Sequence, residues 1–125
     1  VFVWGSMILG RCGKDVSYQG NDPAKFPRSV LWIGKTYIPD GASDIKLNGS
    51  SIACDWSCQV SEKDFLKFKN KSVGIEFKKY EKPENVFDKG PFPYYIYVNR
   101  HRNGGGITLR YDAKTGKMTG SYSHH

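Results

Sequence analysis

His101 is the side chain best suited to acid-base chemistry. It lies in Arg100-His101-Arg102, directly before a glycine-rich turn. Catalysis would require a carboxylate that orients the ring and a nucleophile, and Asp112 is close enough in sequence to approach across a hairpin. Because no nucleophile-elbow or zinc-protease motif is present, we expect a non-catalytic protein, with a small hydrolase centred on His101 as an alternative.

The three cysteines offer disulfide and metal chemistry. Four residues apart on one strand, Cys54 and Cys58 would lie ~13 Å from each other, whereas a disulfide requires Cα atoms within ~7 Å. A zinc site would need a C-x-x-C knuckle with nearby histidines, and the sequence contains neither. We therefore expect Cys54 and Cys58 to be small core residues, with no metal and no cofactor, while a disulfide from Cys12 to either stays open.

Tyrosines and cations near the C-terminal end predict a binding surface. If Tyr94, Ile96 and Val98 face the core, then Tyr95, Tyr97 and Arg110 share the outer face of a sheet. Such a surface suits single-stranded nucleic acid, because bases stack on aromatic rings, and it equally suits protein recognition. Ordinary cross-strand tyrosine pairs would give the same pattern. The candidate binding residues are Tyr95, Tyr97, Arg100, His101, Arg102 and Arg110.

The segment from Ser51 to Val60 has the clearest strand pattern in the chain. Ile52, Cys54, Trp56, Cys58 and Val60 alternate strictly with polar or small residues. A period of two is typical of a strand with one buried face, so we expect the even-numbered side chains to point into the core.

A helix is predicted directly after this strand. Ser61 can cap its first turn, and Asp64, three residues later, can reach back in the manner of a capping box. Val60 and Phe65 have the spacing of a hydrophobic staple, and Phe65 with Phe68 gives the helix one apolar edge up to residue 70 or 71. We expect Phe65 and Phe68 to dock near Cys54, Trp56 and Cys58.

The remaining periodic segments predict further strands. They are residues 30–38, 42–47, 73–77, 94–99, 107–111 and 117–122, and the last three, joined by glycine-containing turns, should form an antiparallel meander. Residues 1–28 are expected to form an N-terminal arm, which adds a strand or docks, and a polar connection, with one domain at 29–125. The predicted fold class is α+β, a mainly antiparallel sheet of about five to seven strands with one short helix packed on one face.

Composition limits the partners. The 125 residues carry a formal net charge of +7, and the cations are spread along the chain instead of forming a nucleic-acid-binding arm. No apolar run reaches the ~18 residues that span a bilayer, so we expect no transmembrane segment. Partners consistent with this are another protein, an anionic ligand or nucleic acid, and an exposed edge strand permits a homodimer.

Two parts of the chain resemble small uncharacterised bacterial proteins that are often exported or lipid-anchored. The first runs from Tyr37-Ile38-Pro39-Asp40-Gly41 through Ile45 to the helix start Val60-Ser61-Glu62-Lys63-Asp64-Phe65, and the second from Asn103-Gly104-Gly105-Gly106 to Thr115-Gly116-Lys117. The resemblance implies a bacterial protein and favours export over the cytoplasm, but it carries no activity and no site residue.

Overall fold

The strands of this protein form one antiparallel sheet in the order β1-β2-β3-β7-β6-β5-β4. The computed structural model describes residues 15–50, 52–102 and 104–124. The seven strands are β1 Asp15–Gly20, β2 Ser43–Ser50, β3 Ala53–Gln59, β4 Lys78–Tyr80, β5 Tyr94–Arg100, β6 Gly106–Asp112 and β7 Lys117–Ser123. The predicted α+β class, with a single antiparallel sheet, is confirmed.

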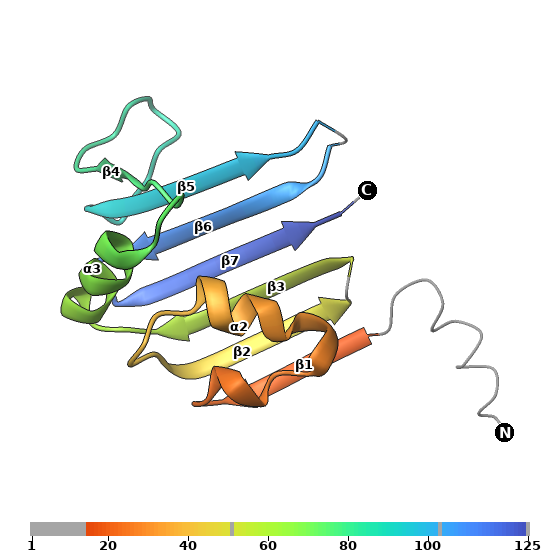
Figure 1. Cartoon of the computed structure of the whole chain (residues 1–125). Coiled ribbons are helices and arrows are strands. Elements are labelled where there is room, and N and C mark those ends of the chain that lie inside the picture. Colours follow the sequence, from red (N-terminus) through yellow and green to blue (C-terminus); the bar gives the residue numbers. More distant parts are fainter. Residues whose placement is uncertain (1–14, 51, 103, 125) are drawn as a thin grey trace, which may run out of the picture.

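Within the described residues, two α-helices, α2 (Leu31–Tyr37) and α3 (Glu62–Lys71), cover the same face of the sheet, and none of these residues forms a helix on the other face (Figure 1). Two short 3-10 turns, Pro23–Lys25 and Arg28–Val30, lead into α2. Among the described helices, none has the length and apolar character needed to cross a membrane. The sheet thus has a helix-bearing face and a helix-free face, and these two names are used below.

The predicted burial of the central even-numbered side chains of β3 is confirmed. Cys54, Trp56 and Cys58 are buried with exposed fractions of 3%, 3% and 2%, on the helix-bearing face. Ile52 was expected to join them, but it precedes the strand and is 44% exposed. Trp56 packs tightly because its neighbour on β7 is Gly120, where a Cβ atom would collide with the indole ring.

Helix α3 begins as predicted. The Ser61 hydroxyl accepts a hydrogen bond from the Asp64 backbone N–H at 3.1 Å, which satisfies one of the free donors of the first turn. Its anchor, Phe65, is fully buried and stacks on Tyr111 of β6 with ring centroids 4.0 Å apart. Phe65 shares one core cluster with Cys54, Trp56 and Cys58, and the ring of Trp56 contacts Tyr37 of α2.

A helix, not a strand, occupies residues 31–37, so the prediction of a single helix is wrong. Val30, Ile33, Gly34 and Tyr37 have the i, i+3, i+4, i+7 spacing of a helical face, and the first three are buried. The β-branched and aromatic residues obscured this period, and packing on the sheet overrides their intrinsic preference for strands.

The two edge strands also differ from expectation. Residues 15–20, predicted as part of a polar connection, form β1, because Val16 and Tyr18 alternate with exposed residues and pair with β2. Residues 73–77 form no strand; Gly74 has a positive φ of 84°, and pairing begins only at β4. The predicted arm at residues 1–10 and Cys12 lie outside the described residues.

The meander β5-β6-β7 is confirmed, and β7 lies in the middle of the sheet (Figure 1). On one side, β7 pairs with β3, which continues into β2 and β1; on the other side it pairs with β6, which continues into β5 and β4. Every strand pairing is antiparallel. The core lies between the helix-bearing face and the two helices.

Candidate functional site

The predicted tyrosine surface does not exist, because Tyr95 and Tyr97 lie on the helix-bearing face. The β5–β6 register places Tyr95 opposite Tyr111 and Tyr97 opposite Leu109, and both of these partners are fully buried. Tyr95 itself is only 5% exposed, with its ring 5.1 Å from that of Phe65. The assignment of faces failed in β5 because both of its rows are aromatic or aliphatic, so the pattern has no polar side.

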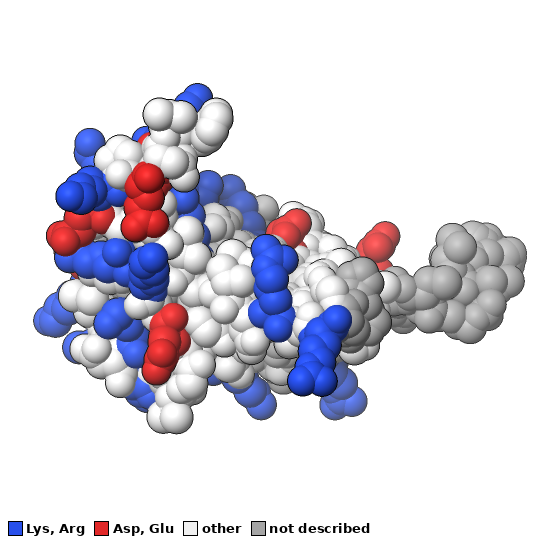
Figure 2. All heavy atoms as spheres, turned by 90° about the horizontal axis from the view of Figure 1, so that it is seen from above, with Lys and Arg blue, Asp and Glu red and all other residues white. Residues whose placement is uncertain are grey.

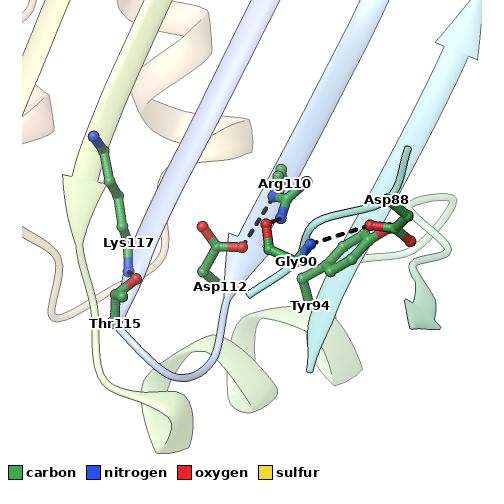
Figure 3. Close-up of polar contacts among 7 residues, drawn as sticks. All are labelled: Asp88, Gly90, Tyr94, Arg110, Asp112, Thr115 and Lys117. Carbon is green, nitrogen blue, oxygen red and sulfur yellow. Dashed lines mark hydrogen bonds and ion pairs between the residues drawn. The ribbon is translucent and has the colours of Figure 1, made fainter. Parts of the chain in front are cut away.

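Arg110 does lie on the helix-free face, but it is committed to internal contacts (Figure 3). Its Nε donates to Asp112 Oδ1 at 2.9 Å, and its Nη2 donates to the Gly90 carbonyl oxygen at 3.2 Å. The guanidinium also lies 4.0 Å from the ring centre of Tyr94. Arg110 therefore ties the loop at residues 81–93 to the end of β6.

Tyr94 is the second anchor of this loop. Its hydroxyl donates to Asp88 Oδ2 at 2.8 Å, and its ring stacks on Tyr80 with centroids 4.9 Å apart. Burial, assisted by the hydrogen bond to Asp88, raises the pKa of Tyr94 to about 12, so the hydroxyl stays protonated at neutral pH and remains a donor. The loop is thus fixed against the helix-free face at two points.

The hairpin tip carries the other predicted residues. Arg100, His101 and Arg102 are exposed where β5 turns into β6, whereas Asp112 lies at the opposite end of β6, paired with Tyr94. His101 and Asp112 therefore cannot act together, since strand pairing separates them by the whole length of β6. Neither of the grooves described below has His101 in its lining.

The helix-free face holds a groove of about 660 Å³ across the centre of the sheet. The register aligns one row of side chains over five strands, and a second row lies beside it. The first row is Ile96, Arg110, Thr119, Ser57 and Lys46, and the second includes Thr108, Ser121, Asp55 and Asn48. The side chains of the floor carry hydroxyl and amide groups, two cations and one carboxylate, but most of the surface that the groove exposes is carbon.

The loop at residues 81–93 adjoins this groove at its β5 side, where the Gly90 carbonyl oxygen accepts a hydrogen bond from Arg110. Ile96 borders both the groove and a smaller hollow of about 360 Å³, which Phe87, Asn85 and Tyr94 also line. Val86 and Phe87 are 88% and 85% exposed, although both are apolar. A loop with two exposed apolar side chains therefore lies next to the groove, and one of them, Phe87, lines the neighbouring hollow.

The cysteines are core residues in the described chain. Burial raises the pKa of Cys54 to about 11 and that of Cys58 to about 12, so both are protonated and poor nucleophiles at neutral pH. Both are free thiols, and the described residues contain no group of three metal-binding side chains. A pairing with Cys12 falls outside the described residues.

Positive charge forms no single continuous block on the surface that Figure 2 shows. Lys and Arg are most numerous at the end of the molecule where α3 and β4 lie, and Asp and Glu are interspersed among them (Figure 2). The distribution therefore provides no continuous track for a phosphate backbone on that surface.

The polar residues of the groove follow a recognisable pattern in the sequence. Asp55 and Ser57 of β3, Thr108 and Arg110 of β6, and Thr119 of β7 are the polar members of alternating strands. A run of such positions on neighbouring strands predicts a polar sheet face, but the strand order is needed to align them.

Comparison with known proteins identifies no match, so a functional assignment depends on the geometry of the site alone. The chain matches no family model, no curated protein and no solved structure.

Proposed function

We propose that this protein is a non-catalytic interaction module that binds an extended segment of a protein partner in the groove on its helix-free face. The observation that carries the proposal is a groove of about 660 Å³ with polar side chains in its lining, next to a loop that exposes the apolar side chains of Val86 and Phe87. Protein interfaces combine these two elements, because an apolar anchor supplies most of the affinity and polar groups fix the register.

A protein partner is favoured over nucleic acid by what lies in the groove. Stacking of successive bases would need several exposed rings on this face, but Tyr95 and Tyr97 lie on the other one, and Phe87 supplies one exposed ring beside the groove. The floor carries Lys46 and Arg110 against Asp55, and the Arg110 side chain is held by Asp112 and Gly90. The alternative of a hydrolase centred on His101 loses its support because Asp112 is at the far end of the strand.

Peptides selected from a random phage-displayed library by the whole chain provide a probe for the groove. We expect their binding to shift the amide NMR signals of Ser57, Thr108 and Thr119, and Phe87→Ala to weaken it about tenfold, which is the loss of a modest apolar anchor. Val73→Ala is the matched control, because Val73 is 98% exposed but lies next to α3, on the helix-bearing side. Peptides that perturb only the helix side, or equal effects of the two variants, would contradict the proposal.

A second measurement separates the two classes of partner. A fluorescein-labelled single-stranded DNA of twenty nucleotides and the selected peptide are each titrated at 50 and 200 mM salt. We expect peptide affinity to change less than about threefold, since the contact with Phe87 is apolar. Saturable DNA binding that falls ~10³-fold over this range and shifts the same amide signals would instead establish a nucleic-acid module.

A further inference from the structure

A cleft separates the two helices on the helix-bearing side of the molecule, opposite the groove. It has a volume of about 560 Å³ and is bordered by the C-terminal half of α2, the α2–β2 connection, α3 and the residues that follow α3. This volume is within the ~300–1,000 Å³ typical of small-molecule sites. The cleft shares no lining residue with the groove.

The inner part of the cleft is apolar. Ile38 and Ile75 line it with exposed fractions of 5% and 9%, and Phe68 of α3 lies between core and solvent. Val73, which is 98% exposed, also borders it. An apolar chain or ring placed here would remove these carbon surfaces from water, which favours binding through the hydrophobic effect.

The rim of the cleft is cationic on balance. Lys35 of α2 and Lys67 and Lys71 of α3 line it, against Asp40 and Asp64. Lys71 Nζ lies 3.8 Å from Asp40 Oδ2, so these two charges compensate each other. Asp64 is in the first turn of α3, where the helix dipole already favours a carboxylate. No ion pair within 4.0 Å is found for Lys35 or Lys67 among the described side chains.

We propose that this cleft binds an amphipathic carboxylate, with its apolar part on Ile38, Phe68 and Ile75 and its carboxylate between Lys35 and Lys67. The apolar floor favours an apolar group in the ligand, and the two lysines favour a carboxylate. A purely polar anion would leave the apolar floor in water, and an uncharged apolar molecule would leave the lysines without a partner. The inference is independent of the proposed function, because the cleft and the groove lie on opposite faces.

The test uses octanoate and 1-octanol as a pair that differs only in charge and head group. Each is titrated into the ¹⁵N-labelled full chain, followed by amide chemical shifts. We expect saturable shifts centred on residues 35–41 and 67–75, with octanoate binding more tightly than octanol. Shifts that centre on the helix-free face, or an absence of saturation at 10 mM octanoate, would overturn the proposal.

Variants on one helix separate a built site from general attraction to positive charge. Lys67→Gln should weaken octanoate binding about three- to fivefold, the loss of a partly exposed ion pair, and leave octanol within twofold. Lys63→Gln removes the same charge from α3 but from an exposed side chain that does not line the cleft, so octanoate affinity should not change. Equal losses in the two variants would mean nonspecific charge attraction and would contradict the site.

The apolar floor needs its own variant. Phe68→Leu preserves an apolar side chain and the fold while reducing the contact area, and it should weaken octanoate and octanol to a similar extent. Thermal melts of each variant verify that the native state is populated. Unchanged affinities in folded Phe68→Leu would place the ligand elsewhere and overturn the proposal.

Discussion

The helix-bearing and helix-free faces belong to the same seven strands, yet their chemistry is opposite. One face is a continuous aromatic and aliphatic core around Phe65, Tyr111 and Trp56, whereas the centre of the other is lined with Ser, Thr and single charges. The difference shows that α2 and α3 fix which row of each strand is core, and that the opposite row is left for binding. The following predictions test how sharp this division is.

The largest loss should come from Phe65→Ala. Phe65 contacts Tyr111, Tyr95 and Phe77, so truncation leaves a cavity at the junction of α3 and the sheet and should cost about 3–5 kcal/mol of unfolding free energy. Trp56→Ala should fall in the same range. Denaturant melts measure both, and comparable small losses for the two variants would show that the core face is wrongly identified.

Alkaline pH should destabilise the helix-bearing face. Burial raises the pKa of Cys54 to about 11 and of Cys58 to about 12 from an ordinary value of 9.0, so above pH 9 the unfolded chain releases protons that the folded chain retains. The contribution of the two thiols to the free energy of unfolding is therefore fully present below pH 9. It falls above pH 9, by about 1 kcal/mol for each thiol between pH 9 and pH 10.

Urea melts at several pH values measure this slope. The double variant Cys54→Ala/Cys58→Ala should start with a lower stability at pH 7 but show a flatter decline above pH 9. An identical slope in the double variant and the native chain would assign the alkaline loss to other groups.

Tyr111→Phe should have an intermediate effect. The Tyr111 hydroxyl donates to the Val60 carbonyl oxygen at 2.9 Å in the buried core, so its removal leaves that acceptor unsatisfied and should cost about 1–2 kcal/mol. Tyr97→Phe is the control, because Tyr97 is only partly buried, and its stability should change by less than about 0.5 kcal/mol. A reversed order in denaturant melts would contradict the assigned hydrogen bond.

On the helix-free face, Arg110→Ala should loosen the loop more than the whole domain. Loss of the contacts to Asp112, Gly90 and Tyr94 should cost about 1 kcal/mol, since the pair is partly exposed, and should speed tryptic cleavage after Lys89. Arg100→Ala, at the exposed hairpin tip, should leave that cleavage rate unchanged. Equal rates in both variants would mean that Arg110 does not hold the loop.

The smallest effect should come from the floor of the groove. Thr108→Ala replaces an exposed hydroxyl, and the free energy of unfolding should change by less than about 0.5 kcal/mol in the same melts. A larger loss would show that the helix-free face also supports the fold, and would remove the contrast on which the proposed function rests.

Prediction from sequence worked where a pattern had one physical interpretation. The polar-apolar contrast in β3, the Ser61 cap of α3 and the turns of the last meander each favour one local structure. β5 has no such contrast, so only its contact with Phe65 decides which tyrosines are buried. α2 is short and rich in strand-forming residues, so its helical spacing was masked by composition.

The polar positions of the groove could be predicted strand by strand, but the groove as a whole could not. Its polar positions are visible in β3, β6 and β7 separately, but the central place of β7 between β3 and β6 sets their alignment. The Arg110 contact with the Gly90 carbonyl oxygen joins residues that no local pattern connects. Long-range pairing of this kind follows from the whole sheet and not from any single segment.

The central position of β7 has a consequence for the order of folding during synthesis. β1, β2 and β3 leave the ribosome long before β7, and they pair only with one another until Lys117–Ser123 emerges. Proteolysis of nascent chains stalled before and after that segment has left the exit tunnel should show a sharp gain in resistance. The sheet thus closes only when β7 pairs, so a growing chain exposes the unpaired edges of β3 and β6 until β7 has left the ribosome.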